Sequence, residues 1–219
     1  MVDHLLALFR PFVDRAAIIA HPGFAEQVHA HVSRQALPCE VLEQPSPTGM
    51  LDAILTAEPW VRAADPDHVW VVWCDQVALL PETLERLARA GQADPAPDLI
   101  MPTVRRQDPY IHFARDANGR IVAVRQRREG DQMPLEGESD IGLFSLSARA
   151  FGQLPAFAAV VEPGHGTAER NFLPFIPWLA ARRPVTTIDC TDPREATGIN
   201  TPEDLAGVEA WLSERTAAS

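Results

Sequence analysis

The chain has 219 residues, 46% of them hydrophobic and 22% charged, which is an ordinary globular composition and excludes a disordered or fibrous protein. Its formal net charge of -11 argues against a nucleic-acid partner or an anionic membrane surface. No apolar run approaches the ~20 residues that span a bilayer. We therefore expect a single domain over residues 1–219, with no nucleic-acid or membrane partner.

Basic and sulfur-containing residues limit the chemistry and indicate the compartment. All 19 basic residues are Arg, so no lysine Schiff base or P-loop lysine can operate in this chain. Cys39, Cys74 and Cys190 stand far apart and form no Cys-x-x-Cys motif, which is typical of free thiols in a reducing compartment. The first residues lack the features of a signal peptide, so we expect a cytoplasmic protein.

Apolar spacing predicts alternating helices and strands in the first third of the chain. Strands are expected over 16–20, 39–42 and 68–73, and the last is apolar enough to be buried on both faces. Helices are expected at the start of the chain, over 24–34 with Phe24, Val28 and Val32 on one face, and over 49–61.

The rest of the chain continues the alternation, with one strand-rich interruption. Pro81 stands at the start of a helix, and Thr201 is the expected cap of a final helix on Leu205, Val208 and Leu212. Further strands are expected over 98–104, 141–146 and 185–189, and a kinked helix over 169–181. Two short strands within 110–124 flank the turn Asp116-Ala-Asn-Gly, which is typical of a hairpin.

This order of elements predicts an α/β fold. We expect a three-layer sandwich on a mostly parallel, Rossmann-like mixed sheet. The strand-rich stretch over 110–146 is expected as an antiparallel excursion beside that sheet.

Two polar residues follow strands, where ligands of open α/β sheets bind. Asp75 follows the strand over 68–73 and Cys74, and its carboxylate is suited to hold Mg²⁺ against phosphate oxygens. Asn200 stands between a strand and a helix and would complete a metal site with Asp75. The structural alternatives are a turn-capping role for Asp75 and a plain turn position for Asn200.

The segment from Gln44 to Gly49 leads into a helix. Backbone N–H groups at such a helix start can bind an anion or a base edge. Pro and Gly before a helix are common, so this segment is by itself a weak indication.

Several motifs occur in a recognisable order. They are Gln44-x₄-Gly49-x₃-Ala53, the apolar strand ending in Asp75, an Asp108-Pro hairpin, Asp140-Ile-Gly142-Leu-Phe, and Gly198-Ile-Asn200-Thr-Pro-Glu-Asp-Leu. Over nearly the whole chain this order resembles the nucleotidyltransferase superfamily that makes nucleotide sugars, and most closely the uridylyltransferase domain of the bacterial N-acetylglucosamine-1-phosphate enzyme. Molybdenum-cofactor guanylyltransferases share the broader fold.

The resemblance implies the nucleotide-diphospho-sugar transferase fold and assigns roles to individual residues. By it, Asp75 and Asn200 hold Mg²⁺, with Asp75 at the catalytic centre, while Gln44 and Gly49 bind the nucleotide. Three substrate-binding positions depart from the family pattern: Gln126 replaces a usual Glu, Asp140 replaces a usual Asn, and Ile111-His112 replaces a usual Gly-Arg. All three departures lie on the sugar side.

The family also opens with a strand and a Gly-rich loop that cradle the triphosphate, and this sequence contains neither. We expect roughly 30 residues to be missing, the size of one βα unit. A fragment is the favoured explanation; a wrongly assigned start and a true loss of the loop are the alternatives. We accordingly expect that the 219 residues alone do not turn over, because donors for the β- and γ-phosphates are absent.

Two functions remain open from the sequence. In the first, an NTP and a sugar 1-phosphate react to an NDP-sugar and pyrophosphate with the help of Mg²⁺. In the second, the chain is a non-catalytic nucleotide- or sugar-binding module that has kept the fold and lost the loop. Coding sequence upstream of Met1 with an in-frame Gly-rich loop favours the enzyme, and an immediate stop codon favours the module.

Overall fold

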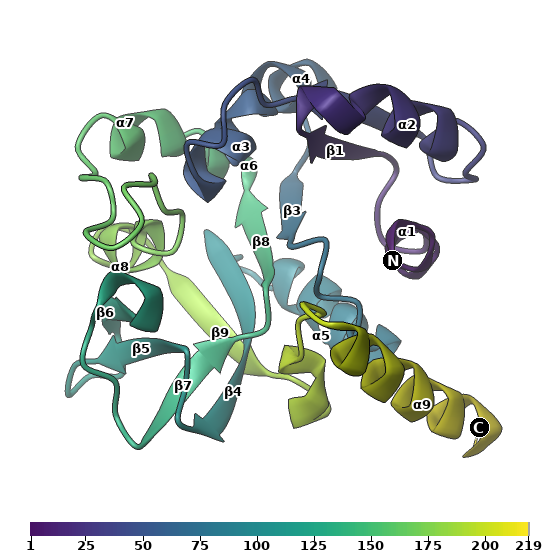
Figure 1. The fold of residues 1–219 in the computed structure, drawn as a ribbon. Coiled ribbons are helices and arrows are strands. Elements are labelled where there is room, and N and C mark those ends of the chain that lie inside the picture. Colours follow the sequence, from purple (N-terminus) through teal and green to yellow (C-terminus); the bar gives the residue numbers. More distant parts are fainter. Residues whose placement is uncertain (219) are drawn as a thin grey trace.

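A five-stranded sheet forms the centre of the molecule (Figure 1). The computed structural model describes residues 1–218. β3 (His68–Val72) pairs with β8 (Leu143–Ser147), which also pairs with the start of β4 (Leu99–Gln107). β7 (Glu136–Asp140) pairs with the second half of β4, and β9 (Val185–Asp189) lies along the other edge of β4.

This sheet is mixed. The pairings of β8 with β3 and of β7 and β8 with β4 are antiparallel, whereas β9 runs parallel to β4. The predicted α/β class with a mixed sheet is confirmed. Antiparallel pairing is nevertheless more extensive than expected, because the stretch over 110–146 supplies β7 and β8 to the sheet itself. β5 (Ile111–Arg115) and β6 (Ile121–Gln126) form the expected hairpin beside it.

Helices cover both faces of the sheet. The side chains of β4 show this, because they alternate between the cores on the two faces. Leu99 and Met101 pack on one face with the aromatic side chains that follow β8, while Ile100 packs on the other with α5 (Pro81–Gly91) and α9 (Pro202–Ala218). All three of these β4 residues are fully buried. Successive strand residues point to opposite faces, so burial of both sets requires the three layers that the sequence predicts.

The first third of the chain forms a separate strand pair. β1 (Ala16–Ala20) pairs in parallel with β2 (Cys39–Glu43), and α2 (Pro22–Val32) connects them. No described strand pairs with the other edge of β1. A cavity of about 1090 Å³ has residues of both β1 and β3 in its wall. The expected single domain over 1–219 and the expected missing strand both stay predictions.

Helix starts follow the predicted signals closely. Pro81 occupies the first turn of α5, whose Leu84 and Leu87 are fully buried. Thr201 caps α9, because its Oγ1 accepts a hydrogen bond from the Asp204 backbone N–H (3.1 Å). Among the α9 side chains up to residue 215, Val208 and Trp211 are buried, whereas the expected core residue Leu205 is 38% exposed.

Proline and sheet edges account for several differences from the expectations. The helix expected over 49–61 is divided into α3 (Met50–Thr56) and α4 (Glu58–Ala64), with Pro59 in the first turn of the second. The helix expected over 169–181 begins only at α8 (Phe175–Ala180), directly after Pro174. Every residue of β3 is half-exposed, because this strand is an edge of the sheet and borders the cavity.

The remaining elements are short, apart from the helix that opens the chain. They are α1 (Val2–Phe9), η1 (Arg127–Glu129), α6 (Ala148–Phe151), α7 (Leu154–Ala158) and η2 (Pro193–Ala196).

Phe24 is 62% exposed, so the predicted apolar face of α2 is wrong at this position. Within residues 1–218, no helix has the length and apolar character needed to cross a membrane.

Candidate active site at the end of strand β3

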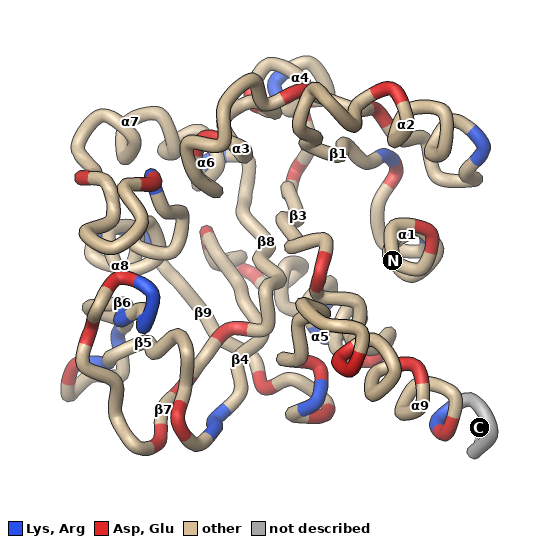
Figure 2. Tube along the Cα trace, viewed as in Figure 1, with Lys and Arg blue, Asp and Glu red and all other residues tan. Residues whose placement is uncertain are grey.

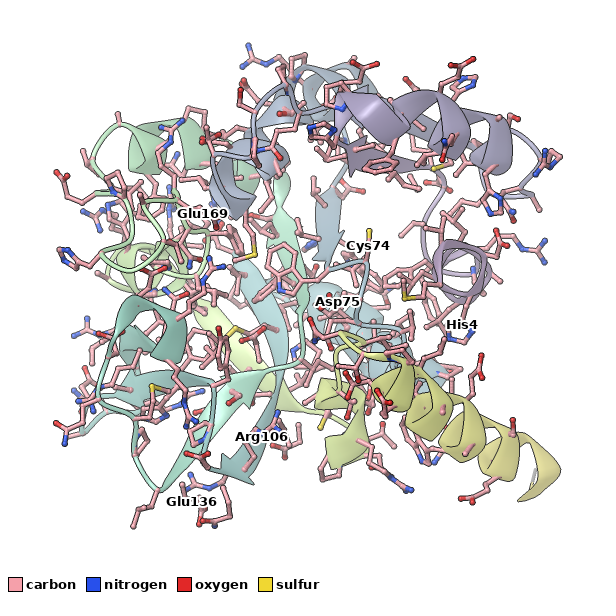
Figure 3. The ribbon with its side chains drawn as sticks, viewed as in Figure 1. His4, Cys74, Asp75, Arg106, Glu136 and Glu169 are labelled. Atoms are coloured by element: carbon pink, nitrogen blue, oxygen red, sulfur yellow. The ribbon has the colours of Figure 1, made fainter. Side chains whose placement is uncertain are left out.

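Three connections of the chain meet just beyond the end of β3, where Asp75 lies (Figure 3). The backbone N–H of Trp73 donates to the carbonyl of Gly142, in the β7–β8 connection (3.1 Å). The carbonyl of Asp75 accepts from the backbone N–H of Ile199, which precedes α9 (2.9 Å). These two bonds fix the β3–α5 connection against segments that come much later in the chain.

Gly198 marks the point on which polar side chains converge. A Cβ added there would lie 3.0 Å from Oδ2 of Asp75, 3.5 Å from Nδ2 of Asn200 and 2.8 Å from Nε2 of Gln76. Asp75 and Asn200, which the sequence pairs as metal ligands, are therefore neighbours in space. Their separation is well below the roughly 10 Å at which two side chains could no longer share one ion.

Asn200 is held in place by the start of α9. Its backbone N–H and that of Thr201 donate to Oδ2 of Asp204, at 3.0 and 2.9 Å. These bonds, the one from the Asn200 backbone foremost, hold the pKa of Asp204 below its ordinary value. The amide Nδ2 of Asn200 donates to the Gly198 carbonyl (3.3 Å), which leaves its Oδ1 as an acceptor or ligand.

The donors at this point fit a magnesium ion. The carboxylate of Asp75 accepts no hydrogen bond from a described residue, and the buried Oε1 of Gln76 has no partner there. No cluster of three or more His, Cys, Asp or Glu residues within 1–218 is arranged to hold a metal. One carboxylate and one amide oxygen are a sufficient set of protein ligands for Mg²⁺, because this ion keeps several waters and takes further ligands from phosphates. Binding of Mg²⁺ itself stays a prediction.

Charge around the site is predominantly acidic or neutral. An acidic position follows β3, and Arg positions occur at the far end of β4 (Figure 2). Arg15 is the one Arg among the described residues that line the cavity beside Asp75, and its guanidinium donates to Glu40 (2.6 Å). A cation held by Asp75 would therefore add positive charge at the carboxylate itself.

Asp140 is linked to the end of β3 by a hydrogen bond with Gly142, whose carbonyl accepts from the Trp73 backbone. Its Oδ2 accepts from the Gly142 backbone N–H (2.9 Å). Burial raises the pKa of Asp140 to about 6, although the hydrogen bond from Gly142 opposes that shift. Gly142 has a φ of +72°, and a Cβ there would lie 2.4 Å from Cγ of Gln76, so only glycine fits.

Gln44 and Gly49 form a turn before α3 that is closed by the protein itself. Nε2 of Gln44 donates to the carbonyl of Gly49 (3.2 Å). Gly49 has a φ of +123°, and a Cβ there would lie 2.4 Å from the carbonyl oxygen of Arg170. That same oxygen accepts from the backbone N–H of Leu51 (3.1 Å), so this N–H of the helix start is not free for a ligand.

His112 and Gln126 lie on the β5–β6 hairpin and are bonded within the protein. Nδ1 of His112 accepts from the backbone N–H of Glu138 (3.2 Å). Gln126 is 4% exposed, and its Oε1 accepts from Nδ2 of Asn171. Gln126 thus has little surface to offer a ligand, and the substrate-binding roles expected for both residues stay predictions.

Sequence reasoning missed Gln76 and did not recognise what the two glycines do. Gly142 and Gly198 belong to the quoted motifs, so their positions were a usable signal. Gln76 follows Asp75 without any pattern that distinguishes it, and only its buried, unpartnered Oε1 draws attention to it.

The sequence is similar to one known protein family and to two known proteins. The family described as a MobA-like NTP transferase domain matches residues 1–139, well over half of the chain. A protein named bifunctional protein GlmU from Solibacter usitatus is 26% identical over 197 residues, covering 87% of this chain and 40% of the relative. Another of the same name from a Synechococcus species is 25% identical over 219 residues, covering 98% of this chain and 46% of the relative.

The extent of these matches matters for the site. This chain spans less than half the length of the curated relatives it matches. The family match includes Gln44, Gly49 and Asp75 but ends before Asp140 and Asn200.

Proposed function

This chain belongs to the family of MobA-like NTP transferase domains, and on that premise we propose that it forms an NDP-sugar and pyrophosphate from an NTP and a sugar 1-phosphate. Membership makes it a nucleotidyltransferase domain. The sugar 1-phosphate, the NDP-sugar product and the dependence on Mg²⁺ are the proposed part. The observation that carries the proposal is the convergence of Asp75 and Asn200 beside Gly198.

The reaction needs no protein nucleophile. A phosphate oxygen of the sugar 1-phosphate attacks the α-phosphorus of the NTP in line, and the bond from that phosphorus to the β-phosphate oxygen breaks. Pyrophosphate leaves with the electron pair of that bond. The task of the protein is therefore to orient the two substrates and to stabilise negative charge on the α-phosphate and the leaving group.

Asp75 and Asn200 are the residues that we propose hold Mg²⁺, which when bound neutralises phosphate charge. Asp75 supplies the anionic ligand and Asn200 an amide oxygen, and the hydrogen bond from Ile199 to the Asp75 carbonyl keeps their segments together. Gln76 lies beside them at Gly198, and its buried Oε1 has no partner among the described residues.

Nucleotide and sugar are proposed to bind on either side of this point. The turn from Gln44 to Gly49 is the proposed nucleotide side, supported by its place at the start of α3, part of which borders the same cavity as Asp75. Asp140, with His112 and Gln126 on the hairpin beyond it, forms the proposed sugar side. A cytoplasmic location is likewise proposed, supported by three cysteines that form no disulfide within the described chain.

Metal-dependent nucleotide binding is the first test, because this sequence contains neither a lysine nor a Gly-rich loop to hold the β- and γ-phosphates. Calorimetry with each of the four common NTPs, with and without Mg²⁺, should identify at least one that binds only with the metal. Asp75→Asn should weaken that binding at least ~10²-fold, since several kcal/mol of charge stabilisation are lost.

Glu203→Gln is the matched control, because Glu203 is an exposed acid close to Asn200 with no described partner in the site. This variant should bind the NTP and metal like the unmodified chain.

Pyrophosphate release with a panel of sugar 1-phosphates is the second readout. Metal-independent binding, or equal binding by the Asp75 variant, would overturn the proposal; binding without pyrophosphate release in a chain extended upstream would identify the non-catalytic module.

A further inference from the structure

Glu195, in the short helix η2, is a fully buried carboxylate with an unusual set of partners. Its Oε1 accepts from Thr83 Oγ1 (2.8 Å) and from the backbone N–H groups of Thr191 (2.7 Å) and Asp192 (3.0 Å). Its Oε2 accepts from the backbone N–H of Leu80 (2.9 Å). Within the described chain no Arg pairs with it. Hydrogen-bond donors alone therefore stabilise this charge.

Two of these bonds, from Leu80 and Thr83, join the two segments that carry the site, and the other two, from Thr191 and Asp192, lie within the second segment. Leu80 ends the connection that begins at Asp75, and the three residues before it are part of a buried core cluster. Thr191 and Asp192 begin the segment that ends at Asn200. Glu195 holds the two segments at one end, and the hydrogen bond from Ile199 to the Asp75 carbonyl holds them at the other.

A carboxylate is required at this position, because all four partners of Glu195 are donors towards it. Glutamine has the same shape but carries an NH₂ group in place of one oxygen. One end of the side chain would then present a donor to a donor, either at the Leu80 N–H or at the three groups around Oε1. With the NH₂ group towards Leu80, the bond that breaks ties the Asp75 segment to the segment of Asn200. With the NH₂ group on the other side, the bonds that break come from the Thr191 and Asp192 N–H groups and hold the segment of Asn200 itself.

We propose that Glu195 is a positioning residue, which sets the relative placement of Asp75 and Asn200 and thereby the affinity of the site for a metal–nucleotide complex. The proposal rests on the proposed function for its metal readout. Glu195 touches neither proposed ligand, so its effect is transmitted through the backbone of the two segments. Loss of a partner that bonds directly to a metal ligand typically lowers metal affinity roughly 10- to 100-fold, and we take this range as the scale for Glu195, which acts on the ligands through the backbone.

The test compares Glu195→Gln with Asp98→Asn. Asp98 is also a fully buried carboxylate with several donors: Ser147 Oγ (2.9 Å) and two guanidinium nitrogens of Arg149 (2.8 and 2.9 Å). Ser147 pairs with His68 at the start of β3, the end opposite to Asp75. Both variants therefore disturb a buried carboxylate, and only one of them disturbs the site.

Binding of Mn²⁺ with an NTP, followed by electron paramagnetic resonance, gives the first readout. Glu195→Gln should weaken binding roughly 10- to 100-fold, and Asp98→Asn should change it less than about threefold, at similar melting temperatures. Equal weakening by both variants, or unchanged binding in a folded Glu195 variant, would overturn the proposal.

Amide hydrogen exchange of residues 197–201 separates this proposal from the proposed function. Glu195→Gln should raise exchange of the Ile199 amide, which bonds to the Asp75 carbonyl, and Asp98→Asn should leave it unchanged. If the unmodified chain binds no metal, the proposed function fails, and the exchange result alone decides on Glu195. Unchanged exchange overturns the positioning role whatever the metal does.

A milder variant serves if Glu195→Gln does not fold. Thr83→Val removes one donor to Glu195 and leaves the carboxylate with its three backbone partners. It also removes the bonds of the Thr83 hydroxyl to Thr191, from the backbone N–H (3.0 Å) and with Oγ1 (2.9 Å), which join the same two segments. It should raise exchange of the Ile199 amide and weaken metal binding in the same direction but by a smaller factor. No change in either quantity would contradict the proposal.

Discussion

Two strands of this molecule, β1 and β4, both contain an apolar run but have very different surroundings. In β4, Leu99, Ile100 and Met101 are fully buried, with neighbouring strands on both edges and helices on both faces. In β1, every residue except Ala20 is half-exposed, and its open edge borders the cavity of about 1090 Å³. An apolar strand is thus buried only as far as its neighbours allow.

This contrast defines two parts of the molecule that meet at the candidate site. The packed half is the five-stranded sheet with its helices, and the open half is the β1–β2 pair with α2. Asn200 and Asp140 lie on segments anchored in the packed half, which contains the five-stranded sheet. The Gln44–Gly49 turn continues from β2 in the open half. Asp75 lies at the boundary, after an edge strand that is half-exposed throughout. We therefore expect substitutions to affect stability strongly on one side of the site and weakly on the other.

The largest effect is expected from the same substitution made in both strands. Ile100→Ala removes a fully buried side chain from β4 and should lower the free energy of unfolding by about 2–5 kcal/mol. Ile18→Ala in β1 should lower it by less than about 1 kcal/mol, because Ile18 already borders open space. Urea denaturation measures both, and equal losses would show that the two halves are equally packed.

A second comparison tests how the open half is attached to the packed half. Gly49→Ala places a Cβ 2.4 Å from the Arg170 carbonyl oxygen at a φ of +123°, and should lower the free energy of unfolding by about 1–3 kcal/mol. Gly119→Ala is the control, because Gly119 also has a positive φ (+80°) but no atom within 4 Å of the added Cβ. A similar loss in both variants would mean that backbone strain, and not the contact with Arg170, accounts for the effect.

A third comparison concerns the pH dependence of stability, at Asp140 in the packed half. Burial raises its pKa to about 6 in the folded protein, above the unfolded value of 3.8. Its contribution to stability is therefore complete below about pH 4 and is lost as the pH rises through 6. Asp140→Asn should be more stable than the unmodified chain at pH 7.5, by about 1–3 kcal/mol, and the difference should vanish towards pH 4.

Asp116 in the β5–β6 hairpin should show the opposite pH dependence of stability, because its pKa is lowered and not raised. Hydrogen bonds, the one from the Arg120 backbone foremost, hold its pKa below the ordinary value. Its contribution to stability is present above that ordinary value and is lost as the pH falls through the lowered pKa. Asp116→Asn should therefore be less stable than the unmodified chain at pH 7.5. A pH-independent difference for the Asp140 variant would contradict a raised pKa there.

Local signals predicted those elements whose formation depends on nearby residues. The bounds of β1 and β9 agree with the expected strands, and the Asp116-Ala-Asn-Gly turn joins β5 and β6 as expected. Such features require only a short apolar run, a turn residue or a cap. The polar strand β7, with the sequence Glu-Gly-Glu-Ser-Asp, was missed, because it is a strand only through its pairing with β4.

By itself, the sequence determined the α/β class, the helix starts at Pro81 and Thr201, and the candidates Asp75 and Asn200. Composition and periodicity carry that information, because it depends on residues a few positions apart. Only the tertiary structure decided that Asp75 and Asn200 meet beside Gly198, that Gln126 is buried against Asn171, and that a carboxylate in η2 joins the two site segments. Those contacts arise where distant segments pack together, and no local pattern in the chain encodes such a distance.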